Sequence, residues 1–113
     1  MVLGSSFCMN SSMPIRELDA LEFRALLFGR EIHVSAHAYD HLHRAQRKVF
    51  KEQELVHMLT QERPRRIYLQ TNGRYAVYYR RTDGYRKLVV AMEKDAVIVS
   101  FVDTQELPLI DLP

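Results

Sequence analysis

The hydrophobic pattern of this chain changes its period near residue 65, from helical spacing to strict alternation. The alternation runs through four stretches rich in Val, Ile and Tyr, which are residue types that favour strands. These stretches are 66–70, 74–81, 85–92 and 96–102. The breaks between them are Asn72-Gly73, Asp83-Gly84 and Lys94-Asp95. Asn-Gly and Asp-Gly favour tight hairpins, so the second half predicts a four-stranded antiparallel meander.

The first half predicts helices over 19–28, 36–48 and 51–61. Asp19 followed by Glu22 has the pattern of a capping box, and Ser35 is a good N-cap for the second helix. Pro64 ends the third helix. The short stretch 31–34 alternates and is either an extended segment or an edge strand.

These elements predict an α+β fold in which N-terminal helices pack on one face of the four-stranded antiparallel β-meander. A chain of 113 residues is the size of one domain. We expect that domain to span 15–104, between a flexible N-terminal tail over 1–14 and an irregular C-terminal tail over 105–113. The one cysteine, Cys8, excludes an intrachain disulfide and predicts a reducing, cytoplasmic setting. No apolar run is long enough to span a membrane, so no membrane partner is expected.

The turn positions predict which side chains share a face of the sheet. With Asp83-Gly84 as a two-residue loop, Arg80 lies opposite Lys87. The expected core face carries Tyr75, Val77, Tyr79, Leu88, Val90, Met92, Val97, Val99 and Phe101. The expected open face carries Arg74, Ala76, Tyr78, Arg80, Lys87, Val89, Ala91, Ile98, Ser100 and Val102. A slip of one residue would exchange the two faces.

Positive charge is concentrated in one stretch of the sequence. The net charge is only +2, yet 63–87 holds eight basic residues and a single acid, Asp83. Arg74, Tyr78, Arg80 and Lys87 share the expected open face. Arginine grips phosphate in two-pronged fashion and tyrosine stacks on bases, which indicates RNA binding. A solvated face whose cations guard against strand pairing is the alternative.

Two polar residue types, histidine and serine, are candidates for chemistry. His37 and His41 lie one helical turn apart, but no third ligand accompanies them, so we expect no metal. A neutral imidazole accepts a proton, which makes His37 a candidate general base. Ordinary surface histidines are the alternative. Ser100 is a small hydroxyl in the middle of a strand, where it either serves the site or bonds to the neighbouring backbone.

The order of these elements resembles a known family. Ser35-Ala-His37-Ala38 opens a helix that carries Arg44 and Arg47, and the strands 73–77, 88–90 and 97–104 follow. This arrangement is similar to small bacterial and archaeal proteins with a Ser-x-His-Ala opening, which belong to the barnase–EndoU–colicin–RelE-like ribonuclease superfamily. The likeness covers about 32–104. Tyr39-Asp40 stand where those proteins often carry an arginine.

The resemblance implies a RelE-like endoribonuclease of toxin type that needs no metal or cofactor, with RNA on the open face and an antitoxin protein as partner. It implies that His37 is the motif histidine, that Arg44 or Arg47 is the basic residue of its helix, and that Ser100 or Thr104 supplies a hydroxyl. The chemistry of RNA cleavage needs a base and cations at the phosphate, for which we expect His37 as the catalytic base and Arg80, Lys87 or Arg74 to stabilise charge. The residues expected to contact RNA are His41, Arg44, Arg74 and Tyr78.

Two other functions are compatible with the same residues. One is a non-catalytic RNA-binding or protein-interaction module of the same fold. The other is a docking surface for a partner peptide or a second copy in a homodimer, formed by the apolar side of the open face. Its residues would be Val89, Ala91, Ile98 and Val102.

Overall fold

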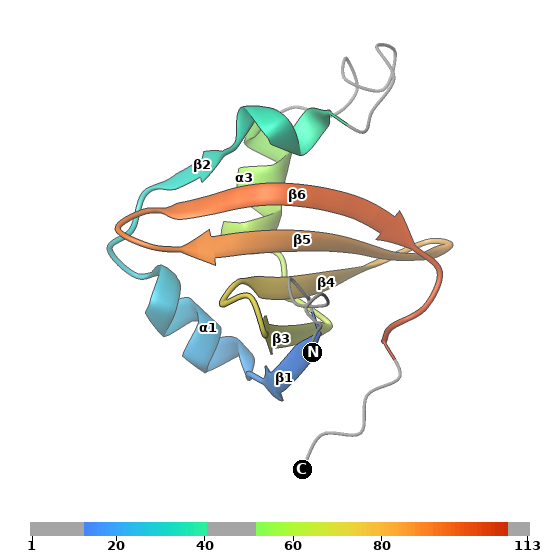
Figure 1. Cartoon of the computed structure of the whole chain (residues 1–113). Coiled ribbons are helices and arrows are strands. Elements are labelled where there is room, and N and C mark those ends of the chain that lie inside the picture. Colours follow the sequence, from blue (N-terminus) through green and yellow to red (C-terminus); the bar gives the residue numbers. More distant parts are fainter. Residues whose placement is uncertain (1–12, 41–51, 109–113) are drawn as a thin grey trace, which may run out of the picture.

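The computed structural model describes residues 13–40 and 52–108 (Figure 1). The elements in chain order are β1 (Pro14–Glu17), α1 (Ala20–Leu27), β2 (Ile32–Val34), the 3-10 turn η2 (Ala36–Tyr39), α3 (Glu52–Gln61), β3 (Arg66–Gln70), β4 (Tyr75–Arg81), β5 (Gly84–Met92) and β6 (Ala96–Thr104).

The strands form one six-stranded mixed sheet in the order β1-β3-β4-β5-β6-β2. Strands β3 to β6 pair consecutively and antiparallel, while β1 adds antiparallel to β3 at one edge. At the other edge β2 pairs parallel with β6. The α+β class is confirmed, but the predicted four-stranded antiparallel sheet is wrong in strand number and orientation. The alternating stretch 31–34 is an edge strand, β2, as one of its two interpretations predicted, whereas β1, with four residues, was not predicted.

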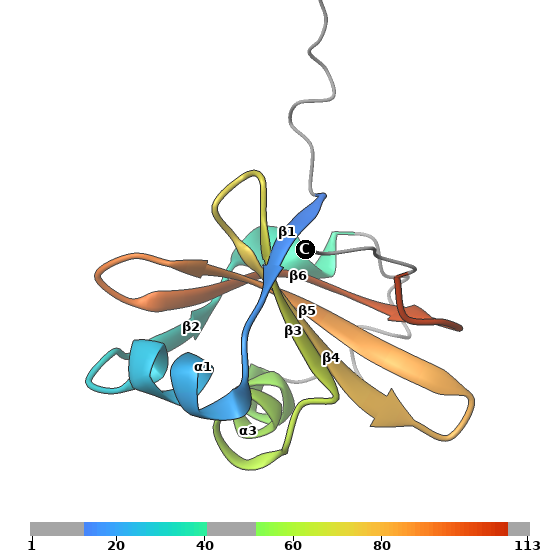
Figure 2. The same cartoon turned by 90° about the horizontal axis from the view of Figure 1, so that it is seen from below.

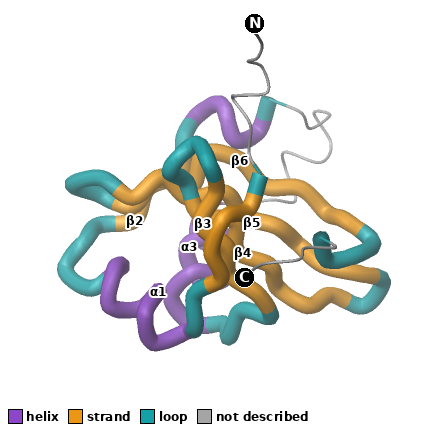
Figure 3. Tube along the Cα trace, turned by 60° about the horizontal axis from the view of Figure 1, so that its bottom comes forward, coloured by secondary structure: helices purple, strands orange, loops and turns teal. Residues whose placement is uncertain are grey.

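Helices α1 and α3 lie on the same face of the sheet, which we call the helix face; the opposite side is the outer face (Figure 2). Figure 3 shows that α1 and α3 lie together on one side of the strands. The core between these layers is apolar, and Phe23 of α1 and Leu55 of α3 are 2% and 0% exposed. The predicted capping box at Asp19 and Glu22 is present at the start of α1.

The predicted second helix begins where expected. Ser35 is its N-cap, and the Ser35 hydroxyl accepts a hydrogen bond from the His37 backbone N–H at 3.2 Å. The described part is a 3-10 turn, Ala36–Tyr39. The rest of the predicted range lies outside the described residues.

The hairpin between β4 and β5 turns one residue earlier than predicted. Arg81 pairs with Gly84, so the loop is Thr82-Asp83 instead of Asp83-Gly84. Gly84 opens β5 with φ 144°, and a Cβ there would collide with the carbonyl oxygen of Thr104. This glycine therefore serves strand packing as well as the turn. Because the register shifts by two positions, the two faces keep their residues and only the cross-strand partners change.

A β-bulge changes the predicted faces at the start of β6. Val89 pairs with Ser100 as expected, but Val90 pairs with Ile98, so the register shifts by one residue. Ile98 is fully buried in the core, whereas Val97 and Val99 are only half-buried. The prediction that Val97 and Val99 lie in the core and Ile98 on the open face is therefore wrong, because the extra residue of a bulge exchanges the faces beyond it.

Candidate nucleic-acid interface

Two cations on the outer face are seated on tyrosine rings. Tyr78 pairs with Lys87 across β4 and β5, and Arg80 pairs with Tyr85. The Lys87 Nζ lies 5.8 Å from the centroid of the Tyr78 ring, and the Arg80 Cζ lies 5.4 Å from that of Tyr85. Arg80 Nη1 also donates to the Tyr85 hydroxyl at 3.2 Å. Each ring attracts its cation by about 0.5–1 kcal/mol and holds the charge in place.

Lys87 is half-buried and has no carboxylate partner among the described residues. Burial lowers the pKa of Lys87, because removing water penalises the ammonium form. The pKa of the Tyr78 phenol beneath it is raised, mainly by burial, so this ring stays neutral at physiological pH. The charge on Lys87 is therefore poorly solvated, and an anion placed beside it would replace the missing water.

The outer face of β4, β5 and β6 carries no carboxylate. The register assigns to it Ala76, Tyr78, Arg80, Tyr85, Lys87, Val89, Ala91, Val97, Ser100, Val102 and Thr104. The helix face differs at the same end of the sheet. There Arg81 is bonded to Glu62 and Arg86 to Asp103, each through two hydrogen bonds.

Tyr78 lies inside a small aromatic cluster. Its ring meets that of Tyr68 edge-to-face with centroids 6.0 Å apart, and it is 5% exposed. Tyr85 and Leu107 pack against the same cluster, so part of the predicted C-terminal tail covers the outer face. Tyr78 was predicted to stack on a base. In this arrangement its ring is covered, and its evident contribution is to seat Lys87.

The predicted residues fall into separate places on the sheet. Ser100 lies diagonally across from Lys87, because Lys87 pairs with Val102. Diagonal neighbours are roughly 7–8 Å apart, so these two predicted residues are brought together. Arg74 precedes β4 at the end away from Arg80, where its backbone N–H donates to Asn72 Oδ1 at 2.9 Å. Arg74 is exposed, and six residues of extended strand separate it from Arg80 by roughly 20 Å.

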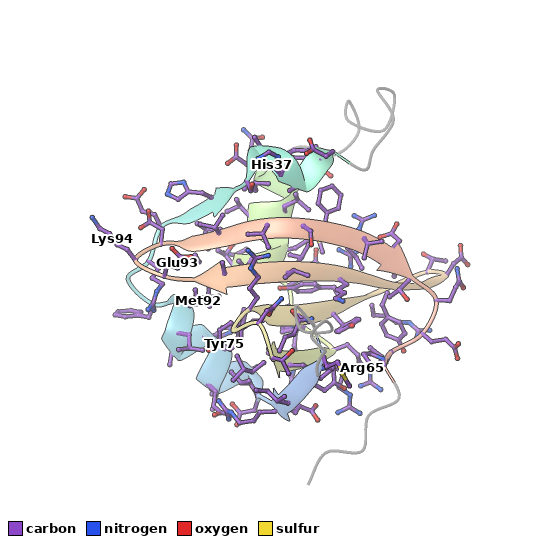
Figure 4. The ribbon with its side chains drawn as sticks, in the orientation of Figure 1. His37, Arg65, Tyr75, Met92, Glu93 and Lys94 are labelled. Atoms are coloured by element: carbon purple, nitrogen blue, oxygen red, sulfur yellow. The ribbon has the colours of Figure 1, made fainter. Side chains whose placement is uncertain are left out.

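His37 lies at the other edge of the sheet. Its side chain is 88% exposed, and its Nδ1 lies 3.0 Å from Oδ2 of Asp40. The turn that carries it follows β2, so β5 and β6 lie between it and Arg80. Strand spacing and rise place the two residues on the order of 20 Å apart. Figure 4 shows His37 at the opposite end of the molecule from Arg65, which precedes β3.

The structure therefore brings Lys87, Ser100, Tyr78 and Arg80 to the outer face but does not bring His37 to them. His41 and Arg44 lie outside the described residues. Tyr85 was missed by the sequence reasoning, because the predicted register placed Lys87 opposite Arg80. The signal that could have found it is the alternation of β5, which puts Tyr85 on the same face as Lys87.

Neither a metal centre nor a membrane-crossing helix is found within 13–40 and 52–108. No group of three potential ligands converges there, and no helix of this part is long and apolar enough to cross a bilayer. Comparison of the chain with protein-family models, with characterised proteins and with solved structures finds no match.

Proposed function

We propose that this protein binds RNA on the outer face of its sheet, with Arg80 and Lys87 as phosphate contacts. The observation that carries the proposal is that the outer face of β4–β6 carries two tyrosine-seated cations and no carboxylate among its own residues. An RNA backbone supplies one negative charge per nucleotide and would neutralise this surplus. The choice of RNA among polyanions rests on the family resemblance.

Seating on tyrosine reduces the cost of binding. A flexible lysine or arginine loses side-chain entropy when it grips a ligand, about 0.5–1.5 kcal/mol for each immobilised side chain. Arg80 is already held by the ring and hydroxyl of Tyr85. The guanidinium keeps further N–H donors for a phosphate, since it has five.

Cleavage of RNA without a metal is the second candidate function. The observation that favours it is the His37–Asp40 pair, in which a carboxylate orients the imidazole. A ribonuclease of this type needs a base at the 2′-hydroxyl and a cation at the same phosphate. His37 lies about 20 Å from Arg80. For this reason we place binding first.

A salt titration of RNA binding tests the first proposal. The probe is a labelled single-stranded RNA, and the test variant is Arg80→Gln/Lys87→Gln. The matched control is Arg24→Gln/Lys94→Gln, which removes two exposed charges from α1 and from the β5–β6 loop. We expect the test variant to lose about 1.4 from the slope of log K against log salt, at about 0.7 per contact, and the control to lose far less. Equal losses in the two variants would refute a defined interface.

A cleavage assay in EDTA tests the second candidate. Total RNA and labelled oligonucleotides are incubated with the wild type, with His37→Ala and with Asp40→Asn. Cleavage that survives EDTA, is abolished in His37→Ala and is reduced in Asp40→Asn would establish His37 as the base. RNA binding without any cleavage would leave the binding module as the function.

The partners follow from the same proposal. We place the protein in the cytoplasm, in keeping with its single cysteine. An antitoxin would compete with RNA for the outer face, and a homodimer would bury the exposed Val102. Light scattering at several protein concentrations measures directly whether the homodimer forms. A monomer throughout would remove the homodimer from the proposal.

A further inference from the structure

A groove lined by four arginines lies beside the outer face. It is formed where the start of α1 approaches the turn between α3 and β3, and its volume is about 370 Å³. The arginines that line it are Arg63, Arg65, Arg66 and Arg80. We call it the arginine groove.

The groove has a surplus of positive charge. The carboxylates that line it are Glu17 and Asp19, so four arginines face two acids and the surplus is two. Both acids are engaged: Glu17 accepts from Arg66 at 3.0 Å, and Asp19 accepts from the backbone N–H of Glu22 at 2.8 Å. Arg63 and Arg65 are exposed and form no ion pair within the described part of the chain.

The turn that carries these arginines is fixed to the sheet. The Arg65 backbone N–H donates to the carbonyl of Tyr78 at 2.6 Å, and Pro64 restricts the backbone beside it. On the other wall, the Leu18 N–H donates to the carbonyl of Ile67 at 2.9 Å. The cations therefore project from an anchored backbone, which lowers the cost of ordering them around a ligand.

Arg80 joins the groove to the outer face. Arg80 lines the groove, and Tyr85 seats its side chain on the outer face. On β4 it lies two positions from Tyr78, which pairs with Lys87 of β5. A chain of phosphates that contacts Lys87 and then Arg80 would continue directly toward Arg63 and Arg65. A site for a single phosphate would not need to connect with the outer face.

We propose that the arginine groove is a phosphate-binding site, and that it takes the backbone phosphates of an RNA strand where the strand leaves the outer face at Arg80. That the phosphates are those of an RNA strand rests on the proposed function. A guanidinium group binds phosphate oxygens through two parallel hydrogen bonds, so a groove lined by four arginines is suited to a phosphate ligand. An acidic peptide is the rival occupant.

Varying the length of the RNA tests whether the strand runs from the outer face into the arginine groove. Affinity is measured for a series of single-stranded RNAs from two to twelve nucleotides, with the wild type and with Arg63→Gln/Arg65→Gln. We expect equal affinity for the shortest RNAs and a loss of about tenfold for the longest, with the salt slope reduced by about 1.4. Arg24→Gln/Lys94→Gln is the control. An equal loss at every length, or none at any length, would overturn the proposed path.

Pyrophosphate tests the site without RNA. The arginine Nε–Hε resonances are followed by NMR during titration with pyrophosphate, in the wild type and in Arg63→Gln/Arg65→Gln. We expect saturable shifts in the wild type that the variant loses. If no RNA binds at any length, the proposed function fails, and these shifts alone decide the groove. No shift in the wild type, or tighter binding of a poly-glutamate peptide than of RNA of equal charge, would overturn the phosphate site.

Discussion

The two faces of the sheet treat their cations in opposite ways. On the helix face, Arg81 is bonded to Glu62 and Arg86 to Asp103. On the outer face, Arg80 and Lys87 rest on tyrosine rings, and neither forms an ion pair within the described residues. The four cations all lie within one hairpin, β4–β5, so the difference arises from the face of the sheet to which each side chain points.

This contrast separates stability from function. A cation paired with a carboxylate is satisfied and contributes to folding, whereas a half-buried cation without one costs free energy in the folded state. Proteins retain such strained groups where a ligand will satisfy them. We therefore expect the polyanion on the outer face. The helix face has more charged residues, but its cations are paired with carboxylates.

The bulge in β6 gives the largest expected effect, because it decides which residues belong to the helix face. Ile98→Ala should lower the free energy of unfolding by about 3 kcal/mol, since Ile98 is fully buried. Val97→Ala, one residue away and half-buried, should cost about 1 kcal/mol or less. Urea denaturation measures both. Equal costs would restore the unbulged register and exchange the two residues between the faces.

Removing an acid from the helix face should cost stability and leave RNA binding intact. Glu62→Gln leaves Arg81 without its partner, and we expect a loss of about 1–2 kcal/mol because the pair is only partly exposed. Glu54→Gln is the matched control, since Glu54 is an exposed acid of α3, the helix that Glu62 directly follows. Thermal unfolding and RNA titration are run on both variants. Weaker RNA binding in Glu62→Gln would break the division between the faces.

Removing a cation from the outer face should weaken RNA binding without a loss of stability. Lys87→Met removes a poorly solvated charge, so stability should rise at neutral pH by less than about 1 kcal/mol, because the side chain is only half-buried. The pKa of Lys87 is lowered in the folded state, so the wild type gains stability as pH rises from that pKa toward the unfolded value of about 10.4. The advantage of the variant should therefore shrink at high pH. Urea denaturation from pH 7 to about 10 tests this, and an advantage that is constant or grows with pH would contradict it.

The smallest expected effect concerns the seat of Arg80. Tyr85→Leu removes the ring and the hydroxyl, and RNA affinity should fall about threefold, the equivalent of one exposed cation–π contact. Tyr85→Phe keeps the ring and should fall less than about twofold. Tyr75→Phe on the helix face is the control. If Tyr85→Leu binds as tightly as the wild type, seating is not part of binding.

Much of the fold was predictable because local signals and tertiary structure agree. Alternation located β3 to β6, and Asp19, Ser35 and Pro64 marked where helices begin or end. The short strands β1 and β2 are stabilised by pairing with β3 and β6, which are distant in sequence. Alternation over 31–34 indicated β2 but not its parallel pairing, and no local pattern marked β1. The bulge is also non-local, because it depends on how two strands fit together.

The candidate site was predictable only in part. The concentration of charge over 63–87 indicated the region, and alternation put Arg80 and Lys87 on the same face. The seating of these cations depends on a register that differs from the predicted one by two positions. The arginine groove requires the turn before β3 to meet the start of α1, two segments that the sequence keeps more than forty residues apart.

The position of β6 has a consequence for how the chain is made. This strand lies between β5 and β2, and Ile32 pairs with Ala96, so β2 waits for more than half of the chain before its partner exists. At roughly 5–20 residues per second, translation leaves β2 unpaired for about 3–13 seconds. The backbone N–H of Ser35 is bonded to the carbonyl of Ile98, so the turn that holds His37 is fixed only when β6 arrives. During synthesis, the edge that carries His37 is therefore the last part of the sheet to be assembled.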